Sequence, residues 1–183
     1  MSHALRNIEF FSDAHGGVMI SDESGVRTYR MEEKAITDEM FAIIEEWYPK
    51  AFKALTEGYK KSRANVPYFK YLIVHRFIRC NFANLDRKLD IDEFGRFNFE
   101  NVDCPLVGEC KGHGVICTPE RSTTLTARQR EVMKLYCDGL TPEEIADRLY
   151  ISVETVKTTK RNAFDKAGVH DIREFMVKYK DIL

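Results

Sequence analysis

The stretch that decides the fold runs from residue 141 to residue 157 and reads TPEEIADRLYISVETVK. Thr141 can cap a helix, Pro142 suits the first helical position, and Glu144 completes a capping box. After a short turn, Ser152 can cap a second helix. The stretch therefore predicts two helices joined tightly, each with a polar residue that marks its start.

The flanking segments extend this pattern to four helices. Thr126 opens an earlier helix with another capping box, and Gly139 is placed to end it. The helix after the tight turn covers about 152–167, and Asp171 opens a last one. Apolar residues at helical spacing give each segment one face that can be buried. We therefore expect an all-α domain at 121–183.

The helix at 152–167 has two different faces. Val156 and Ala163 lie on one face, whereas Lys157 and Arg161 point the other way. A basic face is often merely solvated, but a helix-turn-helix places a helix of this kind in the DNA major groove, and capped helix N-termini bind phosphate. We therefore predict contacts with double-stranded DNA. The predicted contact residues are Lys157, Thr158, Arg161, Lys160, Thr155, Thr141 and Ser152.

Four segments together resemble the DNA-binding domain of LuxR/NarL-type regulators. They are LTARQREV at 125–132, GLTPEEIA at 139–146, ISVETVK at 151–157 and AGV at 167–169. The resemblance covers about a third of the chain and implies a four-helix fold. It also implies that Lys157, Thr158 and Arg161 read bases, and that Thr141, Thr155 and Lys160 lie near the DNA backbone. The same segments are similar to region 4 of bacterial sigma factors.

Two functions follow from these resemblances. The first is a sequence-specific transcriptional regulator that binds promoter DNA as a homodimer, because one small interface gives modest affinity. The second is an accessory protein that binds RNA polymerase and for which DNA contact is secondary. The net charge is −1, and lysine and arginine gather only from Lys157 to Lys166, so one copy should bind DNA weakly.

No P-loop, nucleophile elbow or dinucleotide turn is present, so we do not expect an enzyme.

The first 100 residues predict an α+β module of unknown role. Helical patterns begin at Thr37, Pro49 and Tyr68, and residues 90–99 alternate around a glycine as a hairpin would. Short β-type runs separated by turn sequences predict an antiparallel meander, and they lie at 8–11, 18–20 and 26–29.

The whole chain of 183 residues is therefore expected to be α+β. We predict an N-terminal module of mixed α/β structure at 1–100, a cysteine-containing connector at 101–120 and the all-α domain at 121–183. No apolar run approaches the roughly 18 residues that a membrane span requires. The first residues lack the apolar core of a signal peptide, so we expect a cytoplasmic protein.

Cysteines are the remaining feature of the first 120 residues. Cys104, Cys110 and Cys117 lie close together in the sequence, and Cys80 can supply a fourth thiol. His113 is the alternative fourth ligand. Reduced cysteine clusters in a cytosolic protein favour zinc first and an iron–sulfur cluster second.

Another interpretation of these thiols stays open. The intervals between the cysteines exceed the usual zinc-knuckle spacing, and free cysteines are also common as buried apolar residues. The block from residue 79 to residue 117 is similar to an uncharacterised region that precedes LuxR-type domains in Bacteroidota and their phages. That similarity implies no activity.

Overall fold

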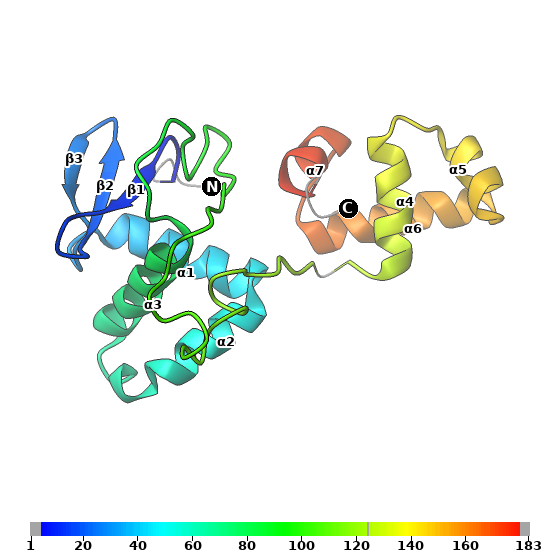
Figure 1. Cartoon of the computed structure of the whole chain (residues 1–183). Helices are drawn as coiled ribbons and strands as arrows, with labels where there is room; N and C mark the ends of the chain where they lie inside the picture. Colours follow the sequence, from blue (N-terminus) through cyan, green and yellow to red (C-terminus); the bar gives the residue numbers. More distant parts are fainter. Residues whose placement is uncertain (1–4, 124, 180–183) are drawn as a thin grey trace. The chain divides into compact units, whose positions relative to one another are not determined.

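The computed structural model describes residues 5–123 and 125–179. The chain divides into two compact units, at residues 1–121 and 122–183 (Figure 1). The first unit combines a small sheet with helices and the second is helical, so the α+β prediction is confirmed. In the described part of the chain, no helix is both long and apolar enough to cross a membrane.

The sheet of the first unit is an antiparallel meander in the order β1-β2-β3, as the sequence predicts. Its strands are β1 (Glu9–Ser12), β2 (Val18–Asp22) and β3 (Gly25–Thr28). The Asp13 carboxylate holds the first turn, because it accepts hydrogen bonds from the backbone N–H groups of His15 and Gly17 at 2.8 Å. Phe10 and Ile20 are fully buried and anchor the sheet to the helices below.

Within residues 5–121, four helical segments complete the regular structure of this unit. They are α1 (Lys34–Trp47), α2 (Pro49–Gly58), the short 3-10 helix η1 (Lys60–Ser62) and α3 (Val66–Asn81). Helix α3 contacts α1, α2, β1 and β2, so it forms the centre of the unit. Its residues Ile73, Val74, Phe77 and Ile78 are fully buried.

The predicted starts of α1 and α3 are wrong by a few residues. Thr37 lies inside α1 and caps nothing, because its hydroxyl forms a buried hydrogen bond of 2.6 Å with the Tyr29 hydroxyl. Helix α3 begins before Tyr68, because the Asn65 side chain accepts a hydrogen bond from the Tyr68 N–H at 3.2 Å. At α1 the expected cap, Thr37, is instead used in a buried contact, and at α3 the cap is Asn65.

Residues 82–121 contain no helix or strand. Phe82 is fully buried and stacks on Phe10, with ring centroids 5.9 Å apart. Ile91 forms isolated bridges with Ile8 and Phe97. The predicted hairpin is therefore wrong in extent, because the segment makes a turn closed by a single bridge rather than two strands.

The segment predicted as a connector, 101–120, belongs to the first unit. The Asn81 side chain at the end of α3 donates hydrogen bonds to the carbonyls of Phe77 at 2.8 Å and Ile116 at 2.9 Å. Ile116 is itself buried. The segment is thus fastened to α3.

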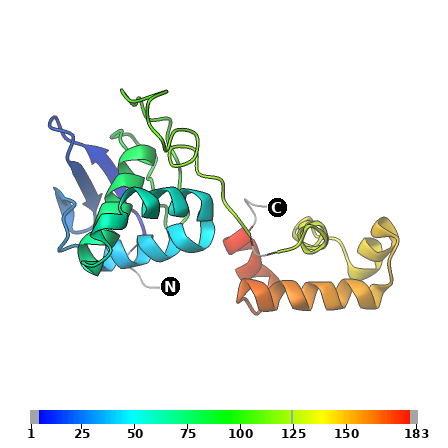
Figure 2. The same ribbon diagram turned by 90° about the horizontal axis from the view of Figure 1, so that it is seen from below.

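Four helices make up the described part of the second unit. They are α4 (Ala127–Cys137), α5 (Pro142–Leu149), α6 (Val153–Ala167) and α7 (Ile172–Tyr179). Thr126, Thr141 and Ser152 each cap the next helix by accepting a backbone N–H, as predicted. Figure 2 shows α6 along its length, with α5 at one end and α7 at the other. Val156 is fully buried against α4 and α5, and Phe175 is fully buried on α7.

Candidate nucleic-acid interface

The turn between α5 and α6 fixes the direction of α6. Tyr150 has left-handed backbone angles, with φ 52° and ψ 49°, and its side chain is 95% exposed. The Ile151 N–H donates to the Ala146 carbonyl at 3.0 Å, which closes a Schellman-type end on α5. Ser152 then accepts the Thr155 N–H at 3.1 Å and starts α6. One backbone hydrogen bond and the Ser152 cap therefore set this turn without a contribution from the Tyr150 ring.

Helix α6 separates apolar and basic residues onto opposite sides. Val156 and Ala163 are fully buried. Lys157 and Arg161 are exposed, and Thr158 is half-buried between the two sides. Because Lys157 and Arg161 are four residues apart, they lie one helical turn apart on the same side. The predicted base-reading residues thus share an accessible surface.

Lys160 has a different environment from its neighbours. Its ammonium group lies 4.6 Å from the ring centre of Tyr136 and 5.4 Å from that of Phe164. These cation–π contacts join α6 to α4, which the sequence did not indicate. Beside it lies a shallow hollow, lined by Lys157, Lys160, Arg161, Phe164, Asp165, Val169 and His170.

The hydroxyls predicted to lie near phosphates are exposed but already take part in caps. The Thr141 hydroxyl donates to the Glu144 carboxylate at 2.9 Å, and the Thr141 N–H donates to the same carboxylate at 2.7 Å. These hydrogen bonds lower the pKa of Glu144. The hydroxyls of Ser152 and Thr155 lie 2.8 Å apart. A phosphate at α5 would therefore meet a carboxylate as well as the helix N-terminus.

Sequence reasoning missed the contact that ties α4 to α5. Arg128 donates a hydrogen bond to the Leu149 carbonyl at the end of α5, at 3.2 Å. The same guanidinium pairs with Glu131 at 2.6 Å. Arg128 thus contacts both the end of α5 and a neighbouring side chain of its own helix. Both side chains are short-range neighbours on α4, so only the contact with Leu149 required the structure.

Comparison with known proteins identifies the second unit. Residues 123–178 match the family described as bacterial regulatory proteins, luxR family. These residues form a luxR-family domain. The chain is also similar to proteins named HTH-type transcriptional regulator MalT. The one from Serratia proteamaculans is 29% identical over 94 residues, which is 51% of this chain and 10% of that protein.

The MalT of Klebsiella pneumoniae strain 342 is 32% identical over 80 residues, or 44% of this chain and 9% of that protein. The chain therefore spans about a tenth of the length of the curated relatives that it matches. No solved structure matches the chain. The luxR-family domain coincides with the unit that contains the capped helices and the basic side of α6.

Outside the luxR-family domain, the predicted metal ligands lie near the end of α3. Cys80, Cys104, Cys110 and Cys117 are partly exposed and form no disulfide. His113 is exposed. No three of these five residues have their ligand atoms within 4.8 Å of one another. The structure therefore gathers the cysteines in one region without a ready site for a single small ion.

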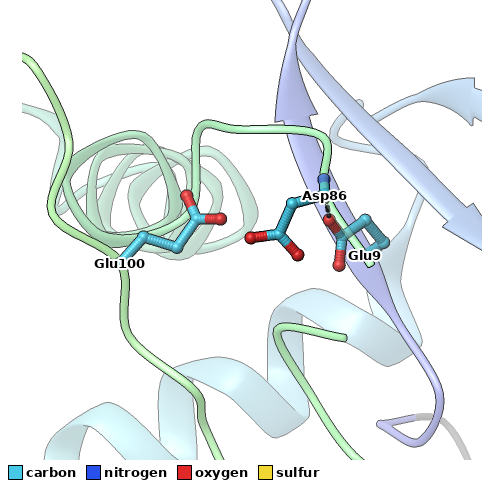
Figure 3. Close-up of side chains that lie close together, drawn as sticks. All are labelled: Glu9, Asp86 and Glu100. Carbon is cyan, nitrogen blue, oxygen red and sulfur yellow. Dashed lines mark hydrogen bonds between the residues drawn. The ribbon is translucent and has the colours of Figure 1, made fainter. Parts of the chain in front are cut away.

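In the described part of the chain, three carboxylates do meet that distance: Glu9, Asp86 and Glu100 (Figure 3). Glu9 accepts the Asp86 N–H at 3.0 Å, and Glu100 accepts the N–H groups of Ala83 and Asn84 at 2.8 and 2.9 Å. The carboxylates of Glu9 and Glu100 thus fasten the loop after α3. This structural role accounts for the cluster without an ion.

Asp90 is a second buried acid in the same region, beside Glu9. It is fully buried, and its Oδ2 accepts the Phe10 N–H at 2.7 Å, whereas its Oδ1 has no hydrogen-bond partner. Burial raises the pKa of Asp90 to about 8, and the nearby carboxylates of Glu9 and Glu100 add to the rise. The sequence predicted only a hairpin at 90–99 and gave no sign that Asp90 is buried.

Proposed function

We propose that this chain is a sequence-specific DNA-binding transcriptional regulator whose helix α6 enters the major groove. The observation that carries the proposal is the division of α6, which exposes Lys157 and Arg161 while Val156 and Ala163 are buried. The luxR-family match and the MalT relatives, which are named as transcriptional regulators, support it. Such a protein would act in the cytoplasm, where its DNA is.

Each residue of the interface has a distinct role in this proposal. Lys157 and Arg161 donate hydrogen bonds to base acceptors such as O6 and N7 of guanine. The Thr158 hydroxyl can bond to a donor or to an acceptor on a base edge. The capped N-termini of α5 and α6 lie beside phosphates. The residues near the backbone are Thr141, Ser152, Thr155 and Lys160.

A homodimer on DNA is part of the proposal. One copy exposes few lysine and arginine side chains on α6. Glu144 and Glu154 place negative charge at the starts of α5 and α6. Phosphate neutralisation provides most non-specific affinity, so a single copy should bind weakly. Two copies double the contacts and read a longer site.

Binding to selected DNA tests the readout. A preferred site is first selected from random duplexes with the full chain, and affinities are then measured by fluorescence anisotropy. Lys157→Ala and Arg161→Ala should each cost about 1–3 kcal/mol on that site and relax its sequence. The control is Lys134→Ala, which removes one charge from the exposed side of α4 and should bind as the parent does.

If Lys157→Ala and Arg161→Ala both bound like the parent, α6 would not be the reading helix. Binding to RNA polymerase without sequence preference for DNA would favour the accessory-protein alternative.

A second measurement tests the dimer. Two half-sites about 10 bp apart should bind the chain more tightly than one half-site does. Equal affinity for the two duplexes, with one chain per duplex by light scattering, would contradict dimeric binding and leave the readout intact.

A further inference from the structure

Four of the five cysteines lie around the C-terminal end of α3, in the first unit. Cys80 belongs to the helix, and Cys104, Cys110 and Cys117 follow in the segment without helix or strand. All four are partly exposed, and none is in a disulfide. The fifth, Cys137, belongs to α4 of the luxR-family domain. These four thiols have no part in the proposed DNA contacts.

Two side chains of α3 hold the cysteine segment against the helix. The Arg76 guanidinium donates a hydrogen bond to the Cys110 Sγ at 3.3 Å. Because Arg76 and Cys80 are four residues apart, they share one side of α3, so Cys110 lies beside Cys80. The bond from Asn81 to the Ile116 carbonyl brings the residue before Cys117 to the same place. Cys104, Cys110 and Cys117 are also all near enough to interact electrostatically with the Cys80 thiol.

The sulfur atoms of this group accept hydrogen bonds. The Gly112 N–H donates to the Cys110 Sγ at 3.3 Å, and the Gly114 N–H donates to the Cys117 Sγ at 3.4 Å. A neutral thiol is a weak acceptor, whereas a metal-bound thiolate accepts such bonds well and is tuned by them. Gly114 has φ +72°, a backbone conformation that lets the chain bend around the sulfur. The segment therefore offers donors where bound thiolates need them.

The spread of the sulfurs favours one kind of metal centre over another. A tetrahedral zinc ion with Zn–S bonds of about 2.3 Å requires its sulfurs to lie about 3.8 Å apart. No three of the four sulfurs meet even a 4.8 Å limit. A cubane iron–sulfur cluster contains bridging sulfides of its own, so its four cysteine ligands stand farther apart than those of one ion.

We propose that Cys80, Cys104, Cys110 and Cys117 bind a [4Fe–4S] cluster. On loading, each thiol loses its proton and forms one bond from sulfur to iron. The iron comes as equal amounts of ferrous and ferric ions, with one sulfide ion for each iron, so no further oxidant or reductant is required. The resulting centre carries net negative charge, and the Arg76 guanidinium beside Cys110 compensates part of it.

Reconstitution of the full chain tests this proposal. Under anaerobic conditions, ferrous and ferric salts with sulfide should give a brown protein with about four iron and four sulfide per chain. Cys80→Ser should lose most of that iron and the visible absorbance. The control, Cys137→Ser, removes the thiol of the other unit and should load like the parent. Fluorescence of Trp47, the single tryptophan, checks that the first unit is folded in each variant.

A second variant tests the proposal independently if Cys80→Ser does not fold. Arg76→Gln should retain the iron but lower the reduction potential, because a positive charge next to the cluster is lost. A colourless protein that holds one zinc ion per chain would overturn the proposal in favour of a single-ion site. So would a protein that takes up no iron and whose four thiols react freely with a thiol reagent.

Neither of those outcomes affects DNA binding by the luxR-family domain, so failure of the cluster and failure of the proposed function are distinguishable.

Discussion

The helix caps of the second unit and the buried carboxylates of the first unit form hydrogen bonds over very different distances along the chain. In the luxR-family domain, Thr126, Thr141 and Ser152 each bond to a residue three positions later. In the first unit, the Phe10 and Asp90 pair spans 80 residues, and the Glu9 carboxylate bonds to residues 77 and 81 positions away. A helix cap forms within one turn and does not require the rest of the unit to be folded. A long-range carboxylate bond forms only when the segments that carry its two partners have folded together.

This difference predicts which unit is more sensitive to change. Each helix of the second unit has its own start signal, so a substitution there should act locally. The loop after α3 has no regular hydrogen-bonding pattern of its own and depends on Phe82, Asp90 and Glu100. Loss of any one of these residues should therefore affect the first unit as a whole.

The largest expected effect comes from Phe82→Ala. Phe82 is fully buried among aromatic rings, so its removal should lower the free energy of unfolding of the first unit by about 3–5 kcal/mol. Urea unfolding followed by Trp47 fluorescence measures this change. Phe94→Ala in the same loop is the control, since Phe94 is 51% exposed and should cost little. A parallel loss of DNA affinity in Phe82→Ala would show that the units depend on each other.

A pH dependence should also separate the units. Burial raises the pKa of Asp90 to about 8, so the folded state keeps a proton that the unfolded state has lost. The stability from this proton is complete below about pH 4 and is lost as the pH rises toward 8, at about 1.4 kcal/mol per pKa unit. Burial also raises the pKa of Glu9 and adds to the effect.

Urea midpoints of the first unit should therefore fall between about pH 5 and pH 8. Asp90→Asn should weaken this fall, whereas Asp103→Asn, at an exposed acid, should keep it. An unchanged fall in Asp90→Asn would assign the pH dependence to other groups.

A smaller effect, of opposite sign, is expected in the second unit from Tyr150→Gly. Tyr150 has positive φ, which is unfavourable for a residue with a side chain, and its exposed ring contributes little packing. The substitution should stabilise the luxR-family domain by about 0.5–1 kcal/mol. Thermal unfolding followed by circular dichroism measures it, with Tyr150→Ala as the control that keeps the strain. Equal melting temperatures of the two variants would contradict the claim that the backbone is strained at residue 150.

An equally small effect on stability, this time a loss, is expected from Lys160→Ala. Its cation–π contacts with Tyr136 and Phe164 should be worth about 0.5–1 kcal/mol at this half-exposed site. The affinity of Lys160→Ala for preferred and for random duplexes should fall by the same factor, because Lys160 lies near phosphates rather than bases. Lys160→Arg, which keeps both charge and ring contact, should restore both measurements. A change in sequence preference would instead place Lys160 at a base.

The luxR-family domain could be predicted from the sequence because its signals are short-range. The capping boxes at Thr126 and Thr141 and the cap at Ser152 each occupy four residues, and all three were found correctly. The meander was found for the same reason, since turns such as the one at Asp13 are local. The base-reading roles of Lys157 and Arg161 stay a prediction.

What could not be predicted depends on partners outside the local pattern, from 8 to 80 residues away in the chain. Thr37 looks like a helix cap until its hydrogen bond to Tyr29 is known. Asp90 looks solvated until Phe10 is seen to donate to it. The cysteines could be listed from the sequence, but their relation to Arg76 depends on how residues 101–120 lie along α3. In each case the deciding contact is absent from the local pattern.

The bond between Phe10 and Asp90 also has a consequence for biosynthesis. Ribosomes add about 5–20 residues per second, so the 80 residues that separate the two partners take roughly 4–16 s to make. During that interval β1 has emerged with Phe10 but without the loop that covers it. Strand β1 can therefore pair with β2 early in translation, whereas the Phe10 N–H gains its buried partner only after residue 90 has been made.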